Sequence, residues 1–378
     1  MTLDFHKVDL NRRTLLKGLG SAISLPVLAS CGRLSYEDNQ EHWLSAAGSN
    51  KDSFSLSWTH GLTKNTDSLL SGFRGHGLTK HPINKSIALM FSRRPGNQAI
   101  LMDLKTKKMV GHFTSPDHLY MEGHGCFSHD GRYLFCTESN KQTHQGIITV
   151  RETTSYKVIK EIPSGGIGPH EIQIMPNQNT LVIANGGLIK DSKGHVINTQ
   201  SMKSNITFLN YDLGKILSTY DGEHSQASLR HLDISNDGIV AIAMQAQVYN
   251  PERLMPLTSL INKDGSKTVL NAPDHLLKKL NGYVGSVRIN NKYRTAAFTS
   301  PRGDIALFWN IDNGVFLGQQ FFHNVCGLTV STDEEYFVLS NSAGKIRQIH
   351  ASTLVENTDL RRHFPSFQWD NHMITVGS

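Results

Sequence analysis

The chain lacks the features of a small, fibrous or membrane-spanning protein. It has only 4 cysteines in 378 residues, which excludes a disulfide-dense miniprotein. Its 32 glycines are far below the one residue in three of a collagen-like fibre. A mildly apolar stretch at residues 18–28 is too short, and too rich in Gly and Ser, to span a bilayer. A chain of this length can instead bury a sizeable core.

Runs of like charge are also missing. The 38 Lys and Arg outnumber the 32 Asp and Glu, but they are scattered and never form a run of five or six. We therefore expect no nucleic-acid partner. There is no nucleophile-elbow serine, no zinc-protease helix motif and no phosphate-binding glycine loop. The unusual abundance is in histidine, with 19 residues.

Residues 1–30 are similar to an export signal. They contain Asn11-Arg12-Arg13-Thr14-Leu15-Leu16-Lys17, which resembles the twin-arginine motif. Leu28-Ala29-Ser30-Cys31 resembles a bacterial lipobox, in which Cys31 is acylated, and Gly32 after it favours the outer membrane. Ordinary signal cleavage near Ala29 is the alternative. We expect a twin-arginine lipoprotein-type signal at 1–30, a linker at 31–50 and a periplasmic, membrane-tethered domain at 51–378.

Three cysteines remain after Cys31, an odd number for an oxidising compartment. Cys126 and Cys136 lie on neighbouring segments of one expected hairpin and could form a disulfide. Two buried thiols are an equally good interpretation of that pair.

The rest of the chain is a repeat of β-hairpins. Each repeat begins with an alternating or apolar run of residues. In most repeats a turn signal follows about six residues after the start, and then a second apolar run. We call the residue at the start of each repeat its landmark. The landmarks are at positions 76, 124, 170, 231, 285, 326 and 372, with spacings of 48, 46, 61, 54, 41 and 46 residues. Spacing near 45 to 50 is the period of a four-stranded propeller blade.

Closure of the ring gives the number of blades. The blade opened by His372 is too near the C-terminus to be completed there, so its missing strands must come from residues 54–73. We therefore expect an all-β, seven-bladed propeller closed by N- and C-terminal strands in one blade, which leaves no exposed sheet edges. The two long spacings predict insertions around 188–203 and 249–256.

The motifs resemble those of an exported propeller family catalogued as domain of unknown function 1513. The match runs from Arg74 to His372 and includes Arg74-Gly75-His76-Gly77, Gly123-His124-Gly125, Gly166-Ile167-Gly168-Pro169-His170-Glu171, Ser228-Leu229-Arg230-His231-Leu232 and Trp369-Asp370-Asn371-His372. The resemblance implies no established activity. Members are often encoded beside imelysin-like and di-haem peroxidase-like proteins, which implies iron acquisition and partners of those kinds.

The repeat predicts a site, because the first strand of each propeller blade lines the central channel. Equivalent positions should therefore face one another around the axis. Five landmarks are histidines and a sixth is a cysteine, types that bind Fe, Cu or Zn. The expected metal ligands are His76, His124, His170, His231, Cys326 and His372.

Further polar residues are expected at the same end of the central channel, which we call its mouth, because the second strand of each hairpin runs back to that end. They would bind a ligand or orient the imidazoles through their second nitrogen. The set is Arg74, Arg93, Glu122, Glu138, Glu171, Asn185, Arg230, Gln245, Arg302, Asn341 and Asp370.

Two chemistries remain open for this mouth. The histidines could hold a transition metal directly, or protonated histidines with the arginines could clamp a carboxylate or phosphate. Metal binding should weaken as pH falls through the imidazole range, whereas anion capture should strengthen. Any single histidine here could also be purely structural.

Three functions follow from these alternatives. The first is a tethered propeller that binds a metal ion or metal complex and assists iron uptake or handling. The second is a propeller enzyme, a lyase, lactonase or redox catalyst, which uses the same His, Arg and Glu mouth. The third is a protein-interaction scaffold without chemistry in its channel.

Overall fold

The structure is a computed structural model that describes residues 41–49, 52–61, 65–191, 195–248, 250, 252 and 254–377. These residues belong to one compact unit, Asn39–Ser378. The export signal expected at 1–30 and the acylation site expected at Cys31 lie outside the described residues. Within the described part, no helix has the length and apolar character needed to cross a membrane.

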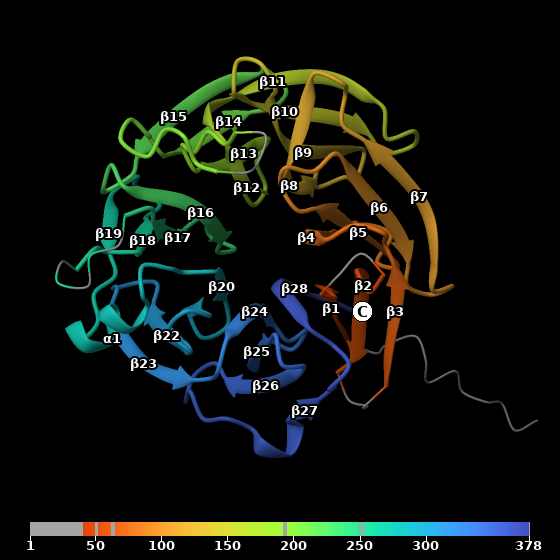
Figure 1. Cartoon of the computed structure of the whole chain (residues 1–378). Helices are drawn as coiled ribbons and strands as arrows, with labels where there is room; N and C mark the ends of the chain where they lie inside the picture. Colours follow the sequence, from red (N-terminus) through yellow and green to blue (C-terminus); the bar gives the residue numbers. More distant parts are fainter. Residues whose placement is uncertain are drawn as a thin grey trace, which may run out of the picture. The chain divides into compact units, whose positions relative to one another are not determined.

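The described residues form seven antiparallel sheets of four strands, arranged in a ring as the sequence predicts (Figure 1). We number the blades in chain order, with the closing blade last. Blades 1 to 3 consist of β4(Gly75–Lys80), β5(Ile87–Ser92), β6(Gln98–Asp103) and β7(Lys108–Thr114); β8(Leu119–Phe127), β9(Tyr133–Asn140), β10(Gln145–Glu152) and β11(Val158–Ile167); and β12(Pro169–Ile174), β13(Thr180–Asn185), β14(Asn205–Asn210) and β15(Lys215–Asp221).

Blades 4 to 6 follow the same meander. They consist of β16(Ala227–Ile234), β17(Val240–Ala246), β18(Thr258–Ile261) and β19(Lys267–Val269); β20(Ser286–Asn290), β21(Thr295–Ser300), β22(Ile305–Asn310) and β23(Phe316–Phe321); and β24(Val325–Val330), β25(Tyr336–Asn341), β26(Lys345–His350) and β27(Arg362–His363). The short helix α1(Asp274–Lys279) precedes blade 5, and the 3-10 turn η1(Thr358–Leu360) precedes β27. The two long spacings correspond to the connections from β13 to β14 and from β17 to β18.

Blade 7 closes the ring with strands from both ends of the unit. Its order is β28(Trp369–Val376), β1(His42–Ala47), β2(Ser55–His60) and β3(Thr66–Leu70). Closure by a C-terminal inner strand and N-terminal outer strands is thus confirmed. The β1 strand lies within 31–50, the range that the sequence analysis assigns to a linker. It pairs with β28 on one side and β2 on the other, so the propeller extends N-terminally to at least His42.

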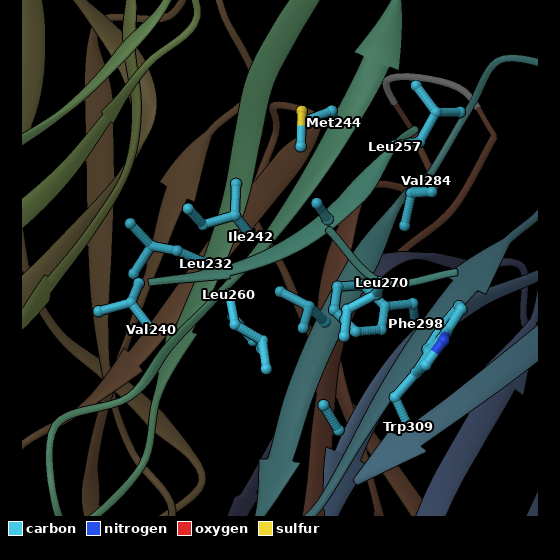
Figure 2. Close-up of a cluster of buried hydrophobic side chains, with 14 of the residues drawn as sticks. Leu232, Val240, Ile242, Met244, Leu257, Leu260, Leu270, Val284, Phe298 and Trp309 are labelled. Carbon is cyan, nitrogen blue, oxygen red and sulfur yellow. The ribbon is translucent and has the colours of Figure 1, made fainter. Parts of the chain in front are cut away.

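The core lies between neighbouring blades, because each sheet packs one face on the next sheet in the ring. Central strands are buried on both faces, as in β13, whereas outer strands such as β15 are largely exposed. Figure 2 shows the contact of blades 4 and 5, where Leu232 and Val240 of blade 4 share a cluster with Phe298 of blade 5. Trp309 joins it and donates its indole N–H to the Asn271 carbonyl at 2.7 Å. Each fully buried large side chain stabilises the fold by about 1.5 to 3 kcal/mol.

Candidate metal centre

The innermost strand carries the landmark residue in six of the seven blades, and in blade 5 Gly285 directly precedes the inner strand β20. The histidines come from five consecutive blades of the ring: His372 on β28, His76 on β4, His124 on β8, His170 on β12 and His231 on β16. All five are at most 6% exposed. The structure therefore brings together at one place imidazoles that are up to 296 residues apart in the chain.

A shift in strand register occurs at or next to every landmark that is a histidine or a cysteine. The register between first and second strand shifts between Gly75 and Leu78, and again between Met121 and Gly125. Shifts also flank His170, Arg230, Cys326 and the His372 segment. Blade 5, whose landmark is Gly285, pairs regularly through β20 and β21. A bulge bends its strand and re-aims a side chain, so these bulges turn the imidazoles toward the axis.

Glycines leave the space that the imidazoles occupy. A Cβ on Gly77 would lie 2.6 Å from His124 Nδ1, and a Cβ on Gly123 would lie 2.8 Å from His76 Cδ2. Gly123 also has φ of +105°, a backbone conformation that side chains rarely adopt. The Gly-His-Gly motifs thus reflect crowding between blades 1 and 2.

The five imidazoles form a closed, compact ring. Centroids of successive members in the order His76, His124, His170, His231 and His372 are 4.8, 4.8, 4.7 and 4.5 Å apart, and His372 is 4.6 Å from His76. Across the ring, Nε2 of His76 lies 3.3 Å from Nε2 of His170. Two ligands at tetrahedral zinc are about 3.4 Å apart, so this separation suits one shared ion.

Glu171 orients two members of the ring. Its Oε1 lies 3.0 Å from Nδ1 of His124, and its Oε2 lies 3.1 Å from Nδ1 of His231. Burial opposes the charge on Glu171, but the two histidines hold the pKa of this carboxyl well below its usual value. Because an ionised carboxylate only accepts hydrogen bonds, both Nδ1 atoms donate. A neutral imidazole held in this way has its free lone pair on Nε2.

His372 is oriented from blade 5. Its Nδ1 lies 3.3 Å from the Ser286 hydroxyl, whose proton is directed to the Asn371 carbonyl at 2.7 Å. The hydroxyl therefore accepts from Nδ1–H, which again leaves Nε2 with the lone pair. Among the described residues, the buried Nε2 atoms of His124 and His372 have no hydrogen-bond partner.

Burial keeps most of the ring uncharged. It lowers the pKa of His76, His170 and His372 well below 6.5, and neighbouring cationic groups add to the effect. Burial also lowers the pKa of His231 to about 4, although the Glu171 carboxylate opposes the shift. Neutral imidazole is the form that binds metals, so the ring is ready for coordination at neutral pH.

Two sets of three histidines can each converge on one ion. Ligand atoms lie within 4.8 Å of one another in the set of His76, His124 and His170, and in the set of His124, His231 and His372. His124 belongs to both.

Cys326 belongs to neither set among the described residues, which is a correction to the expected ligand list. Its Sγ is directed to the carbonyls of Ser340, Trp369 and Asp370, at 3.9, 3.8 and 3.5 Å. Burial raises the pKa of this thiol to about 12, which favours the neutral S–H that these carbonyls can accept from. Cys126 and Cys136 are free thiols, which decides between the two alternatives for that pair.

Several of the polar residues expected beside the histidines pair with other side chains. Asp370 accepts from Arg74 Nε at 2.9 Å and from Arg93 Nη1 at 3.4 Å. Glu122 is buried and accepts from Arg94 at 3.1 Å and from the Ser139 hydroxyl at 2.7 Å. Arg302 lies over the Tyr283 ring, 4.5 Å from its centroid. None of these contacts reaches an imidazole.

A cavity of about 210 Å³ opens beside the histidine ring. Three histidines of the ring line this cavity, His76, His170 and His231, together with Arg230 and Gln245, all of which the sequence analysis expects at the site. Lys190 also lines it, from the connection between β13 and β14, and sequence reasoning missed this residue. The one available signal was the insertion itself, since a long spacing places extra residues near a blade end without fixing which side chain enters.

Three residues expected at the mouth are used inside the blades instead. Glu138 is fully buried and accepts from Arg151 and Thr149. Asn185 bonds Ser164, Asn205 and Thr207. Asn341 donates to the His323 carbonyl and accepts from the Ala343 and Lys345 amides. The ends of second strands lie deep between two other strands, so their polar side chains satisfy neighbours rather than line a channel.

The fold and the ring together define a seven-bladed β-propeller with a buried histidine cluster on its axis. The chain belongs to the family described as protein of unknown function (DUF1513), whose model matches residues 71–376. Among solved structures, it is similar to Kuenenia stuttgartiensis hydrazine synthase, with a TM-score of 0.62 and 14% identity over 81% of this chain and 92% of that chain. Similarity at this identity concerns the fold alone. No curated protein matches this sequence.

Proposed function

We propose that the histidine ring binds a transition-metal ion, iron, copper or zinc, and that this binding is the central function of the propeller. The observation that carries the proposal is the orientation of His124, His231 and His372. Each has its Nδ1 held by Glu171 or Ser286, and one ring nitrogen of each lies within 4.8 Å of the others. A carboxylate behind a metal-binding imidazole is the usual way of fixing its tautomer.

An all-imidazole donor set indicates the class of metal. Imidazole suits Zn, Cu, Fe and Ni, whereas Mg and Ca prefer oxygen ligands. With the Cys326 thiol directed elsewhere, the donors are nitrogen only. The cavity beside the ring gives an ion an open side for water or for a ligand of its own.

Metal analysis of the purified chain tests the proposal. We expect metal near one ion per chain in the wild type, and its loss in the double variant His124→Ala and His372→Ala. The matched control is His118→Ala, because His118 is exposed and pairs with Glu161 at the surface. The proposal is wrong if the double variant, shown to be folded by circular dichroism, retains the wild-type metal content after loading and desalting.

We further propose a cellular setting, in which the propeller is a periplasmic protein tethered through Cys31 that assists iron uptake or handling. The twin-arginine and lipobox motifs support the location, and the gene context of the family supports the iron link and imelysin-like or peroxidase-like partners. Cell fractionation of wild type and Cys31→Ser tests the tether: the wild type should sediment with membranes and the variant should not. Growth of a deletion strain under iron limitation tests the iron link.

A further inference from the structure

The cavity beside the histidine ring has an unusual charge. Its lining includes four cationic side chains, Arg93, Arg94, Lys190 and Arg230, and no carboxylate among the described residues that line it. Two of the four are already paired, since Arg93 contacts Asp370 at 3.4 Å and Arg94 contacts Glu122 at 3.1 Å. Arg230 and Lys190 have no such ion pair within the described part of the chain.

Arg230 is the more significant of the two, because it is only 6% exposed. Its Nε and Nη1 are buried without a hydrogen-bond partner among the described residues. Leaving a buried guanidinium without a partner is costly, so such an arrangement points to a group that is supplied from outside the chain.

The backbone is shaped to hold Arg230 in this place. Arg230 lies at the register shift between Leu229 and His231. Such a bulge aims the side chain differently from that of a residue in a regular strand. On the neighbouring blade, a Cβ on Gly186 would lie 3.2 Å from Arg230 Nη1, so the glycine leaves room for the guanidinium. Both features favour a specific position rather than a side chain that merely extends into solvent.

Lys190 adds a further positive charge to the lining of the cavity. Burial, followed by the nearby Arg94 and Arg230, lowers its pKa to about 8. Since no carboxylate among the described residues lines the cavity, this positive charge is not balanced by the lining itself.

We propose that this cavity binds a small oxyanion, a carboxylate or phosphate, through Arg230 and Lys190. The planar guanidinium offers paired donors that match the oxygens of either group, and the lysine contributes a second charge. An anion there would lie against His76, His170 and His231. The proposal goes beyond the metal site and needs no metal, because its two cationic residues are not metal ligands.

Calorimetric titration of the full chain tests the anion site. Inorganic phosphate and oxalate are used as separate probes at constant ionic strength. Metal is first removed on a chelating resin, since a soluble polycarboxylate chelator would itself compete for the cavity. We expect at least one probe to bind the wild type, and Arg230→Met to weaken that binding at least about tenfold. Lys190→Met should weaken it by a smaller factor.

The matched control is Arg347→Met, which removes an arginine that already has partners. Arg347 donates to the Phe321 carbonyl at 2.9 Å and lies over the Phe322 ring, so its loss should leave anion binding unchanged. If Arg230→Met does not fold, Lys190→Met decides, because Lys190 lies outside the sheets. The proposal is overturned if neither probe binds the wild type, or if the folded Arg230 and Lys190 variants bind as the wild type does. Metal content is measured in parallel, so that loss of the anion site is distinguished from loss of the metal site.

Discussion

Substitution of Glu171 tests the proposed metal site most directly. Glu171 comes from blade 3 and contacts histidines of blades 2 and 4 through separate oxygens, at 3.0 and 3.1 Å. A glutamine at this position keeps one accepting oxygen but turns the other group into a donor, so one imidazole loses its partner.

We therefore expect Glu171→Gln to fold and to bind metal about 10- to 100-fold more weakly than the wild type, as for other residues behind metal ligands. Competition with a coloured chelator of known affinity measures the change. Glu161→Gln is the control, since Glu161 is a surface partner of His118 and lies away from the ring. Wild-type affinity in the Glu171 variant would show that the carboxylate does not orient the ligands.

At the scale of the element, the period of the sequence predicted the blades because each blade contributes one inner strand with its landmark at the same place. The same period could not predict bulges, and these decide which side chains reach the axis. Cys326 shares the register of the histidines, yet its shorter side chain stops at the carbonyls of β28 and the end of β25. Glu138, Asn185 and Asn341 share a strand end, but their partners within the blades are defined only by tertiary packing.

The missed strand β1 has a similar cause. Five of its six residues are buried, because it is a central strand between neighbouring blades, so it lacks the alternation that identifies a half-exposed strand.

The buried pair of Glu138 and Arg151 helps to join blade 2 to blade 1. Arg151 of β10 donates to Glu138 Oε1 and to the Thr114 carbonyl of β7, both at 3.0 Å, and lies over the Phe113 ring. Burial raises the pKa of Glu138 even though Arg151 opposes the shift. We expect Arg151→Met to destabilise the chain by about 3 to 5 kcal/mol in urea unfolding, because it leaves a buried acid without its cation.

A second substitution separates charge from packing in that pair. Glu138→Gln added to Arg151→Met removes the uncompensated acid and should recover much of the lost free energy of unfolding. Arg132→Met is the control, since Arg132 is an exposed turn residue paired with Asp130. A double variant as unstable as Arg151→Met would mean that packing of the guanidinium, rather than the charge of Glu138, is responsible.

At the scale of the whole molecule, ring closure depends on β1. This strand joins β28, which carries His372, to β2 and β3. Without β1, both neighbouring strands lose a partner and the inner strand of blade 7 loses its attachment to the rest of its blade. We expect a chain that begins at residue 39 to fold cooperatively, and a chain that begins at residue 51 to lose cooperative unfolding in calorimetry. Equal melting of the two would contradict this role of β1.

The histidine ring also makes the stability of the whole propeller depend on pH. In the unfolded chain these imidazoles titrate near 6.5, whereas in the folded chain burial lowers the pKa of His231 to about 4 and those of His76, His170 and His372 well below 6.5. Below pH 6.5 the unfolded state therefore binds protons that the folded state does not.

Stability should consequently be unaffected by these groups above pH 6.5 and fall as the pH decreases, by up to about 1.4 kcal/mol per pH unit for each histidine. Urea midpoints of the metal-stripped chain between about pH 7 and pH 5 measure the slope, in a window above the range where Glu171 titrates. His231→Asn should unfold with a shallower pH dependence than the wild type, while His118→Asn, with its exposed side chain, should match the wild type. Identical slopes in all three proteins would mean that His231 accepts a proton as readily in the folded chain as in the unfolded chain, which would contradict the neutral state of this imidazole.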